Sequence, residues 1–178
     1  MKKIYVLLTK SKTMISKVIS ATTGDRYTHV SISFNDNLCP LYSFSREYIY
    51  LPLPATIKKE KLNKGLYKKF ESMPCALYAI EVEDEKYEKV KKDVEQMMKN
   101  RNQYGYNLIG LLLCRLGLKS KRENKFFCSQ FVSKVLMDGD IIERYKDPSL
   151  VRPNEFSKME QFDCLFKGEL RHLANQKW

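Results

Sequence analysis

Residues 125–136, KFFCSQFVSKVL, place a single cysteine at the point where a short aromatic run becomes a helical pattern. Four apolar residues recur after it at the spacing of one helix face: Phe131, Val132, Val135 and Leu136. Cys128 precedes the first two of these by three and four residues, so a buried structural cysteine is one interpretation. The first turn of a helix also presents free N–H groups and positive potential, which favour a thiolate nucleophile. The stretch predicts a helix that begins at Cys128, and it does not decide between a buried structural cysteine and a nucleophile.

The sequence offers two histidines as the base that a cysteine nucleophile needs. His172 lies in a polar segment near the C-terminal end. His29 begins THVSISF (28–34), whose alternation predicts a strand with His29, Ser31 and Ser33 on its polar side. An imidazole there can face a cleft, although an exposed or hydrogen-bonded strand histidine is the simpler interpretation when His29 is taken alone.

The composition is that of a folded, basic protein. Of its 178 residues, 43% are apolar and 12% aromatic, which is enough to build a core without disulfides. The 32 Lys and Arg against 21 Asp and Glu give a formal charge of +11, which favours anionic partners. Acidic residues are interleaved with the basic runs at 57–69 and 118–124, and no nucleic-acid recognition motif is found. Peripheral contact with an anionic membrane therefore stays open, whereas nucleic-acid binding is disfavoured.

Five cysteines stand at positions 39, 75, 114, 128 and 164, without a CxxC pair. This spacing favours neither a disulfide framework nor a zinc site, and the two separated histidines form no metal-binding motif. We therefore expect no metal and no cofactor. Cys75, Cys114 and Cys164 lie in apolar patterns and are expected to be buried.

Hydrophobic periodicity predicts an α+β fold in one domain that spans residues 1–178. Apolar runs, alternating or continuous, indicate strands at 2–9, 28–34, 40–48, 75–83 and 162–170. Helical spacing and start signals indicate helices at 84–100, 107–116, 128–138 and from Pro153. Prolines and lysines in 51–74 indicate a long, irregular, exposed excursion, for which a lid over a cleft is one role.

Neither apolar segment that bears on cellular location is long enough to cross a membrane or to direct export. NLIGLLLCRLGL (107–118) is broken by Arg115 and is shorter than the roughly 18 residues of a membrane span. The run from Ile4 to Leu8 is shorter than the roughly 7 to 15 residues of a signal-peptide core. We therefore expect a cytoplasmic protein.

Together these pieces resemble the circularly permuted papain-like cysteine hydrolases, the NlpC-like superfamily with its YiiX-like and YycO-like branches. In the permuted members the histidine strand precedes the cysteine helix, and here YTHVSISF (27–34) precedes FFCSQFV (126–132). YGYN (104–107) matches a tyrosine-containing segment before the cysteine helix, and PNEF (153–156) matches a helix start after it. The resemblance implies a central antiparallel sheet packed against helices that include the cysteine helix.

The resemblance also implies a catalytic set. Cys128 would be the nucleophile and His29 the general base. The third residue, which orients the imidazole, would be Ser43, with Glu47 and Arg46 as alternatives. Many relatives have His, Asn, Gln or Glu in that place, and a serine orients a ring less firmly.

The backbone N–H of Cys128 would donate to the oxyanion, and further residues would line the substrate site: Tyr27, Tyr104, Tyr106, Asn107, Ser129 and Gln130. The implied reaction is acyl transfer from an amide, ester or thioester through an acyl-cysteine. The substrate would be a small molecule, a peptide or a lipid-linked compound. The alternative is a catalytically weak or inactive module that binds an anionic lipid or nucleic acid.

Overall fold

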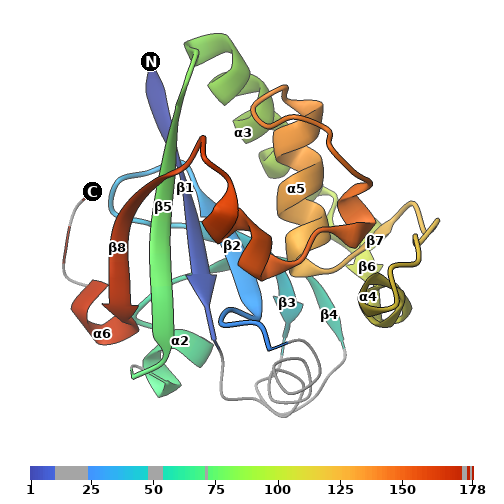
Figure 1. Cartoon of the computed structure of the whole chain (residues 1–178), viewed down its shortest axis with the longest axis horizontal. Coiled ribbons are helices and arrows are strands. Elements are labelled where there is room, and N and C mark those ends of the chain that lie inside the picture. Colours follow the sequence, from blue (N-terminus) through green and yellow to red (C-terminus); the bar gives the residue numbers. More distant parts are fainter. Residues whose placement is uncertain (11–23, 48–53, 71, 174–175, 177) are drawn as a thin grey trace.

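The computed structural model describes residues 1–10, 24–47, 54–70, 72–173, 176 and 178. They form an α+β fold around a six-stranded antiparallel sheet with the order β4-β3-β2-β1-β5-β8 (Figure 1). Its strands are β1 (Lys2–Thr9), β2 (His29–Ser33), β3 (Leu41–Arg46), β4 (Ala55–Glu60), β5 (Pro74–Val82) and β8 (Asp163–Glu169).

The middle of the sheet is formed by β1, whose residues are buried from Ile4 onward. A continuous apolar run suits a strand that is covered on both faces. β1 pairs with β5 along its whole length and with β2 from Tyr5, opposite Ser33, to Thr9, opposite His29. This register fixes His29, the first residue of β2, opposite Thr9, the last residue of β1.

Two hydrophobic cores lie on the two faces of the sheet. On one face, α3 (Asp84–Lys99) and α5 (Cys128–Asp138) cover the first core, in which Phe131 of α5 packs against Phe44 of β3 (Figure 1). On the other face, α2 (Gly65–Lys69) and α6 (Leu170–Leu173) contribute Tyr67, Leu170 and Leu173 to the second core. The cysteine helix therefore packs on the sheet, as expected.

Short elements complete the fold. β6 (Gly105–Tyr106) and β7 (Lys125–Phe126) pair in parallel, which brings the start of α4 (Leu108–Arg115) close to the start of α5. The 3-10 helices are η1 (Arg101–Gln103), η2 (Pro148–Leu150) and η3 (Pro153–Lys158). None of the described helices is both long and apolar enough to span a bilayer.

The predicted excursion at 51–74 is wrong over much of its length. Residues 55–60 form β4, which pairs with β3 along its whole length, and residues 65–69 form α2. Ile57 and Glu60 are buried, and Tyr67 is 1% exposed. Lys58 and Lys59 are consecutive and so lie on opposite faces of β4, while Ile57 and Glu60 on either side of them are buried, because a strand turns successive side chains to opposite faces. Residues 51–53 and 71 lie outside the described residues.

Replacing Phe131 with alanine tests the packing of α5 on the sheet. Its ring is fully buried and lies 5.3 Å from the Phe44 ring, so Phe131→Ala should lower the free energy of unfolding by about 3 to 5 kcal/mol. Leu116→Ala, at a side chain that is 73% exposed, should change it by less than about 0.5 kcal/mol. Urea denaturation of the two variants measures the difference, and equal losses would contradict the described packing.

Candidate active site

His29 and Glu60 face each other across the end of the sheet. The His29 Nε2 atom lies 3.3 Å from Oε2 of Glu60, the last residue of β4. The strand between them in the sheet is β3, which pairs with β2 through Tyr42 and Ile32. The two side chains are only 13% and 6% exposed, so the pair lies in the interior.

The Glu60 carboxylate also accepts three hydroxyl hydrogen bonds. Ser43 donates to Oε2 at 2.7 Å, Tyr67 donates to Oε2 at 3.2 Å, and Ser45 donates to Oε1 at 2.9 Å. The Tyr67 hydroxyl lies 3.4 Å from that of Ser31, which shares the polar side of β2 with His29. A buried carboxylate is stable only when such partners replace water.

Both members of the pair have shifted pKa values. Burial alone would raise the pKa of Glu60, but the His29 charge and the bonds from His29 and Ser43 lower it to about 2. Burial alone would lower the pKa of His29, but the Glu60 charge and hydrogen bonding with Cys128 and Glu60 raise it to about 10. At neutral pH the pair is therefore a carboxylate and an imidazolium.

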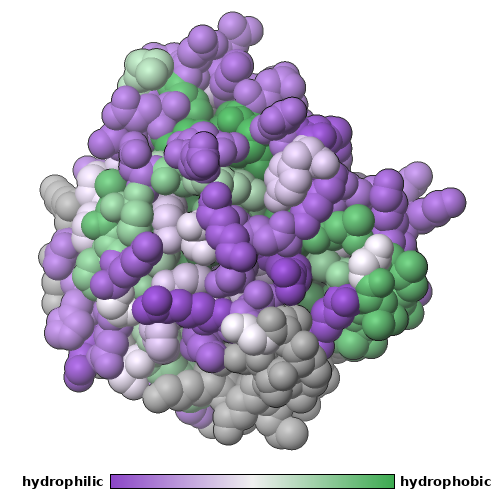
Figure 2. Space-filling view, in the orientation of Figure 1, coloured by the Kyte–Doolittle hydropathy of each residue, from purple (hydrophilic) through white to green (hydrophobic). Residues whose placement is uncertain are grey.

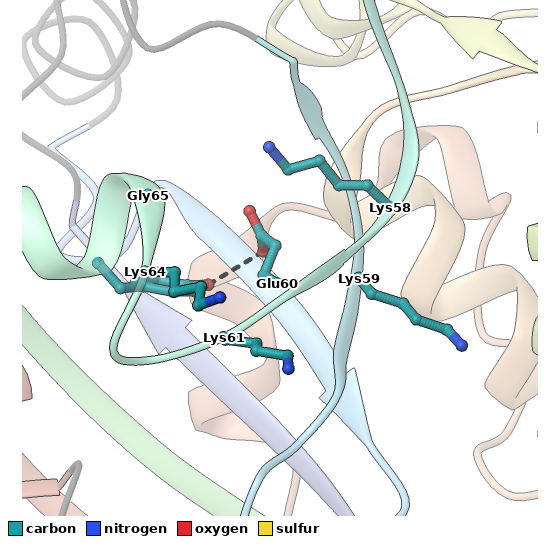
Figure 3. A pocket seen from close by; sticks show the side chains of 7 residues that line it. Lys58, Lys59, Glu60, Lys61, Lys64 and Gly65 are labelled. Atoms are coloured by element: carbon teal, nitrogen blue, oxygen red, sulfur yellow. Dashed lines mark hydrogen bonds between the residues drawn. The ribbon is translucent and has the colours of Figure 1, made fainter.

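A basic pocket of about 210 Å³ lies beside Glu60 and Tyr67 (Figure 3). Four lysines line it: Lys58, Lys59, Lys61 and Lys64. Lys58 extends toward Glu60, whereas Lys59 points away from it. The Lys58 charge also helps to lower the pKa of Glu60. The pocket adds positive potential beside the Glu60 carboxylate.

Cys128 is the first residue of α5 and is 5% exposed. The residue that precedes the helix, Phe127, makes no side-chain cap, so the first-turn N–H groups are not held by it. Hydrogen bonding and charge from Cys128 both act on the His29 imidazole. Because Nε2 of His29 faces Glu60, Nδ1 is the ring nitrogen left for the sulfur. The order in space is therefore Cys128, His29, Glu60.

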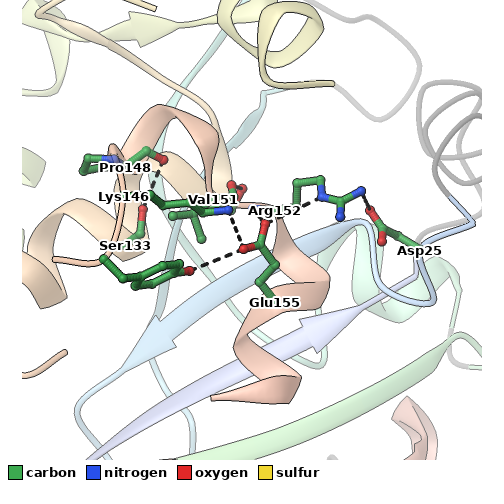
Figure 4. Close-up of polar contacts among 9 residues, drawn as sticks. Asp25, Ser133, Lys146, Pro148, Val151, Arg152 and Glu155 are labelled. Atoms are coloured by element: carbon green, nitrogen blue, oxygen red, sulfur yellow. Dashed lines mark hydrogen bonds and ion pairs between the residues drawn. The ribbon is translucent and has the colours of Figure 1, made fainter. Parts of the chain in front are cut away.

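A small cleft leads to Cys128 from the surface. It is lined by residues of the segment before β2, of β6, of α4 and of the starts of α5 and η3: Asp25, Thr28, Tyr106, Leu111, Cys114, Arg115, Phe127, Cys128, Ser129, Arg152 and Pro153. Arg152 bridges two of these segments, because it lies 3.5 Å from Asp25 and 3.6 Å from Glu155 (Figure 4). The Glu155 carboxylate also accepts hydrogen bonds from Lys146 and Tyr145, so it holds these two side chains and Arg152 together on the η3 side of the cleft.

The cleft is lined by two of the residues that were expected around the substrate, Tyr106 and Ser129. The Ser129 hydroxyl donates to the Val151 carbonyl at 2.7 Å and so fixes the start of α5. Asn107 is fully buried, and its amide donates to Gln130 Oε1 at 3.1 Å. These two amides join α4 to α5 and do not line the cleft.

Tyr104 and Tyr27 also lie away from the described lining of the cleft. The Tyr104 ring packs against Phe44 and Phe126. Tyr27 is 2% exposed, and among the described groups its hydroxyl finds no hydrogen-bond partner. Both tyrosines therefore serve the first core.

The structure places Glu60, not Ser43, against His29. Ser43 is one step removed, since it donates to the Glu60 carboxylate. Glu47 pairs instead with Arg101 of η1 at 2.5 Å. Arg46 belongs to β3, and its side chain lies outside the described ones. Ser43 is the expected third residue because its strand, β3, follows the histidine strand. The strand after it, β4, ends with Glu60, whose carboxylate lies against the His29 ring.

Sequence reasoning missed Glu60 and Tyr67. Both lie in the lysine-rich stretch 57–69, where an acidic residue appears solvated. The signal that was present is the alternation in ATIKKE (55–60), with Ile57 directed to one core and Glu60 to the other face. Burial of Cys75 and Cys114 is confirmed, but Cys164 is exposed because β8 is an edge strand.

No family model and no curated protein matches the chain. Its structure is similar to the crystal structure of the metalloprotein YiiX (DUF1105) of Escherichia coli O157:H7, with a TM-score of 0.61 and 14% sequence identity. The match covers 94% of this chain and 98% of that one. At this identity the likeness concerns the fold.

A metal ion does not fit the donors in the described part of the chain. No group of three His, Cys, Asp or Glu side chains among those residues is placed to hold one. His29 and Glu60 are instead engaged with each other and with hydroxyl donors. The description as a metalloprotein therefore applies to the YiiX structure and is not carried over to this chain.

Glu60→Gln should lower the pKa of His29 well below about 10, because burial then acts on the imidazole without an opposing charge. NMR titration of the His29 ring measures the change, and His172 supplies reference resonances in the same spectra. Ser45→Ala leaves the Glu60 charge in place and should cause a smaller shift. If the titration of His29 were the same in Glu60→Gln and wild type, the two groups would not be coupled.

Folding stability should depend on pH through the same pair. His29, with its raised pKa, adds stability that is complete below 6.5 and lost as pH rises through about 10. Glu60, with its lowered pKa, adds stability that is complete above 4.5 and lost as pH falls through about 2. In urea denaturation at a series of pH values, wild type should therefore exceed Glu60→Gln in stability most clearly between pH 4.5 and 6.5. A margin that does not vary with pH would contradict the ion pair.

Proposed function

We propose that this protein is a cysteine hydrolase or acyltransferase of the permuted papain-like type, and that it acts on an amide, ester or thioester. The observation that carries the proposal is the line of Cys128, His29 and Glu60 at the start of α5. A cysteine at a helix N-terminus, next to an imidazole that a carboxylate holds, has the parts of an activated nucleophile. The strand with the histidine also precedes the helix with the cysteine, as in the permuted members of that superfamily.

In the first step the Cys128 thiolate attacks the carbonyl carbon, which forms an S–C bond and moves the carbonyl electron pair onto oxygen. The backbone N–H of Cys128 is a donor for this oxyanion at the uncapped start of α5. The positive end of the α5 dipole lies on the same side and stabilises the negative charge.

Collapse of this intermediate breaks the bond to the leaving group, which takes a proton from the His29 imidazolium. The product is an acyl-cysteine and a neutral imidazole. His29 then removes a proton from water or another acceptor, which attacks the acyl carbon and releases Cys128. The acceptor decides between hydrolysis and acyl transfer.

Glu60 is the positioning residue in this scheme. Its carboxylate holds the imidazole by one oxygen and is itself held by Ser43, Ser45 and Tyr67. A fixed carboxylate orients the ring toward the sulfur and stabilises the imidazolium between transfers. Ser43 acts through Glu60 and not on the ring.

Alkylation by iodoacetamide tests the nucleophile without knowledge of the substrate. Near pH 6, Cys128 should react faster than Cys164, which is exposed and serves as the reference thiol in the same molecule. His29→Ala should remove this advantage and leave Cys164 unchanged, as read by mass spectrometry of the labelled peptides. If Cys128 stays inert until the protein unfolds, it is a core residue, and a binding module becomes the better description.

A chromogenic thioester then tests turnover. Cys128→Ala should abolish turnover, and Glu60→Gln should lower kcat on the order of a hundredfold, within the range for a group that supports a general base. Ser43→Ala leaves the carboxylate in place and should lower kcat less than Glu60→Gln does. A larger loss in Ser43→Ala would return the orienting role to Ser43.

A further inference from the structure

The outer face of α4 is a ridge of large apolar side chains in water. Leu108, Ile109 and Leu112 of α4 follow one helix face with the C-cap residue Leu116, and Leu118 lies three residues after the last residue of the helix. Their exposed fractions are 37%, 48%, 54%, 73% and 53%. Among the described residues, two other large apolar side chains are exposed, Met1 and Tyr145, and neither belongs to α4. Figure 2 shows an apolar patch over α4.

The opposite face of the same helix is buried. Gly110 and Cys114, four residues apart, face the protein, and the Asn107 side chain caps the start of the helix by accepting a hydrogen bond from the Gly110 N–H at 2.9 Å. The helix is therefore held against the protein by this face, and Leu108, Ile109 and Leu112 lie on its exposed side. Single exposed leucines are ordinary, but four leucines and one isoleucine exposed within eleven residues make a contiguous patch that indicates an interaction surface.

The charge beside the ridge indicates the kind of partner. From the end of α4 to β7 the chain carries five basic residues and one acidic residue, Glu123: the basic ones are Arg115, Lys119, Lys121, Arg122 and Lys125. All of them except Arg115 are exposed. The Lys119 charge helps to lower the pKa of the Asp147 carboxyl, so one more acidic group borders this basic segment. An apolar ridge bordered by lysine and arginine is typical of a helix that lies in the interface of an anionic bilayer.

We infer that α4 and the basic segment after it, residues 108–125, form a docking surface for an anionic lipid membrane. The leucine ridge inserts among the lipid headgroups, and the lysines contact the lipid phosphates and carboxylates. Leu111, Cys114 and Arg115 of the same segment line the cleft that leads to Cys128. Docking would therefore hold the cleft next to the membrane surface, and this last consequence rests on the proposed function, whereas the docking itself does not.

Binding to phosphatidylcholine vesicles, prepared with and without phosphatidylserine, tests the surface. The double variant Leu112→Ser/Leu116→Ser should lower partition into the anionic vesicles on the order of tenfold, because it removes apolar area from the inserted face. Tyr145→Ser, at an exposed aromatic side chain elsewhere, is the matched control and should bind like wild type. Circular dichroism and thermal unfolding confirm that each variant is folded.

Two further variants separate the contributions. Lys119→Glu/Lys121→Glu should weaken binding on the order of tenfold when phosphatidylserine is present and have little effect when it is absent. In Leu116→Trp, the indole emission should shift to the blue when anionic vesicles are added. Cys128→Ala should bind like wild type, so a failure of the proposed chemistry leaves the docking result intact.

Three outcomes would overturn the inference. If the wild-type protein does not bind anionic vesicles, residues 108–125 are not a membrane-docking surface. Equal binding by wild type and the double serine variant would place the contact on another face. A wild-type dimer that the serine variant dissociates, with no binding of vesicles, would assign the ridge to a second copy of the chain.

Discussion

The burial of one carboxylate, that of Glu60, organises the centre of this protein. A charge in the interior is tolerated only with partners, and Glu60 has a histidine and three hydroxyls around it. These partners come from β2, β3 and α2, so the need to satisfy one group holds separate parts of the chain in a defined arrangement. The same arrangement leaves His29 charged and directed toward the start of α5.

Helix α4 joins the site to the surface. Its buried face contributes to the cleft beside Cys128, and its outer face carries the exposed leucine ridge. Parallel pairing of β6 with β7, together with the Asn107–Gln130 hydrogen bond, fixes α4 to α5. A contact made on the outer face of α4 therefore lies one helix away from the cysteine.

Much of the α+β fold follows from local pattern. The strands expected at 2–9, 28–34 and 75–83 and the helices expected at 84–100 and 128–138 are confirmed to within a residue or two at each end. These segments carry strong apolar periodicity, which burial enforces on both strands and helices. Residues 55–60 were mistaken for part of a loop because their lysines mask the alternation, and only pairing with β3 makes them a strand.

The sequence by itself determined that Cys128 begins a helix and that His29 lies on the polar side of a strand, because both follow from spacing along a short stretch. It also identified the run of leucines from 108 to 118, but not that Leu108, Leu112, Leu116 and Leu118 would face water. Tertiary structure decided that His29 meets Cys128, that Glu60 and not Ser43 holds the imidazole, and that Asn107 and Gln130 bind each other. These outcomes depend on which strand ends lie together in the folded sheet, and the spacing of residues along the chain does not specify that.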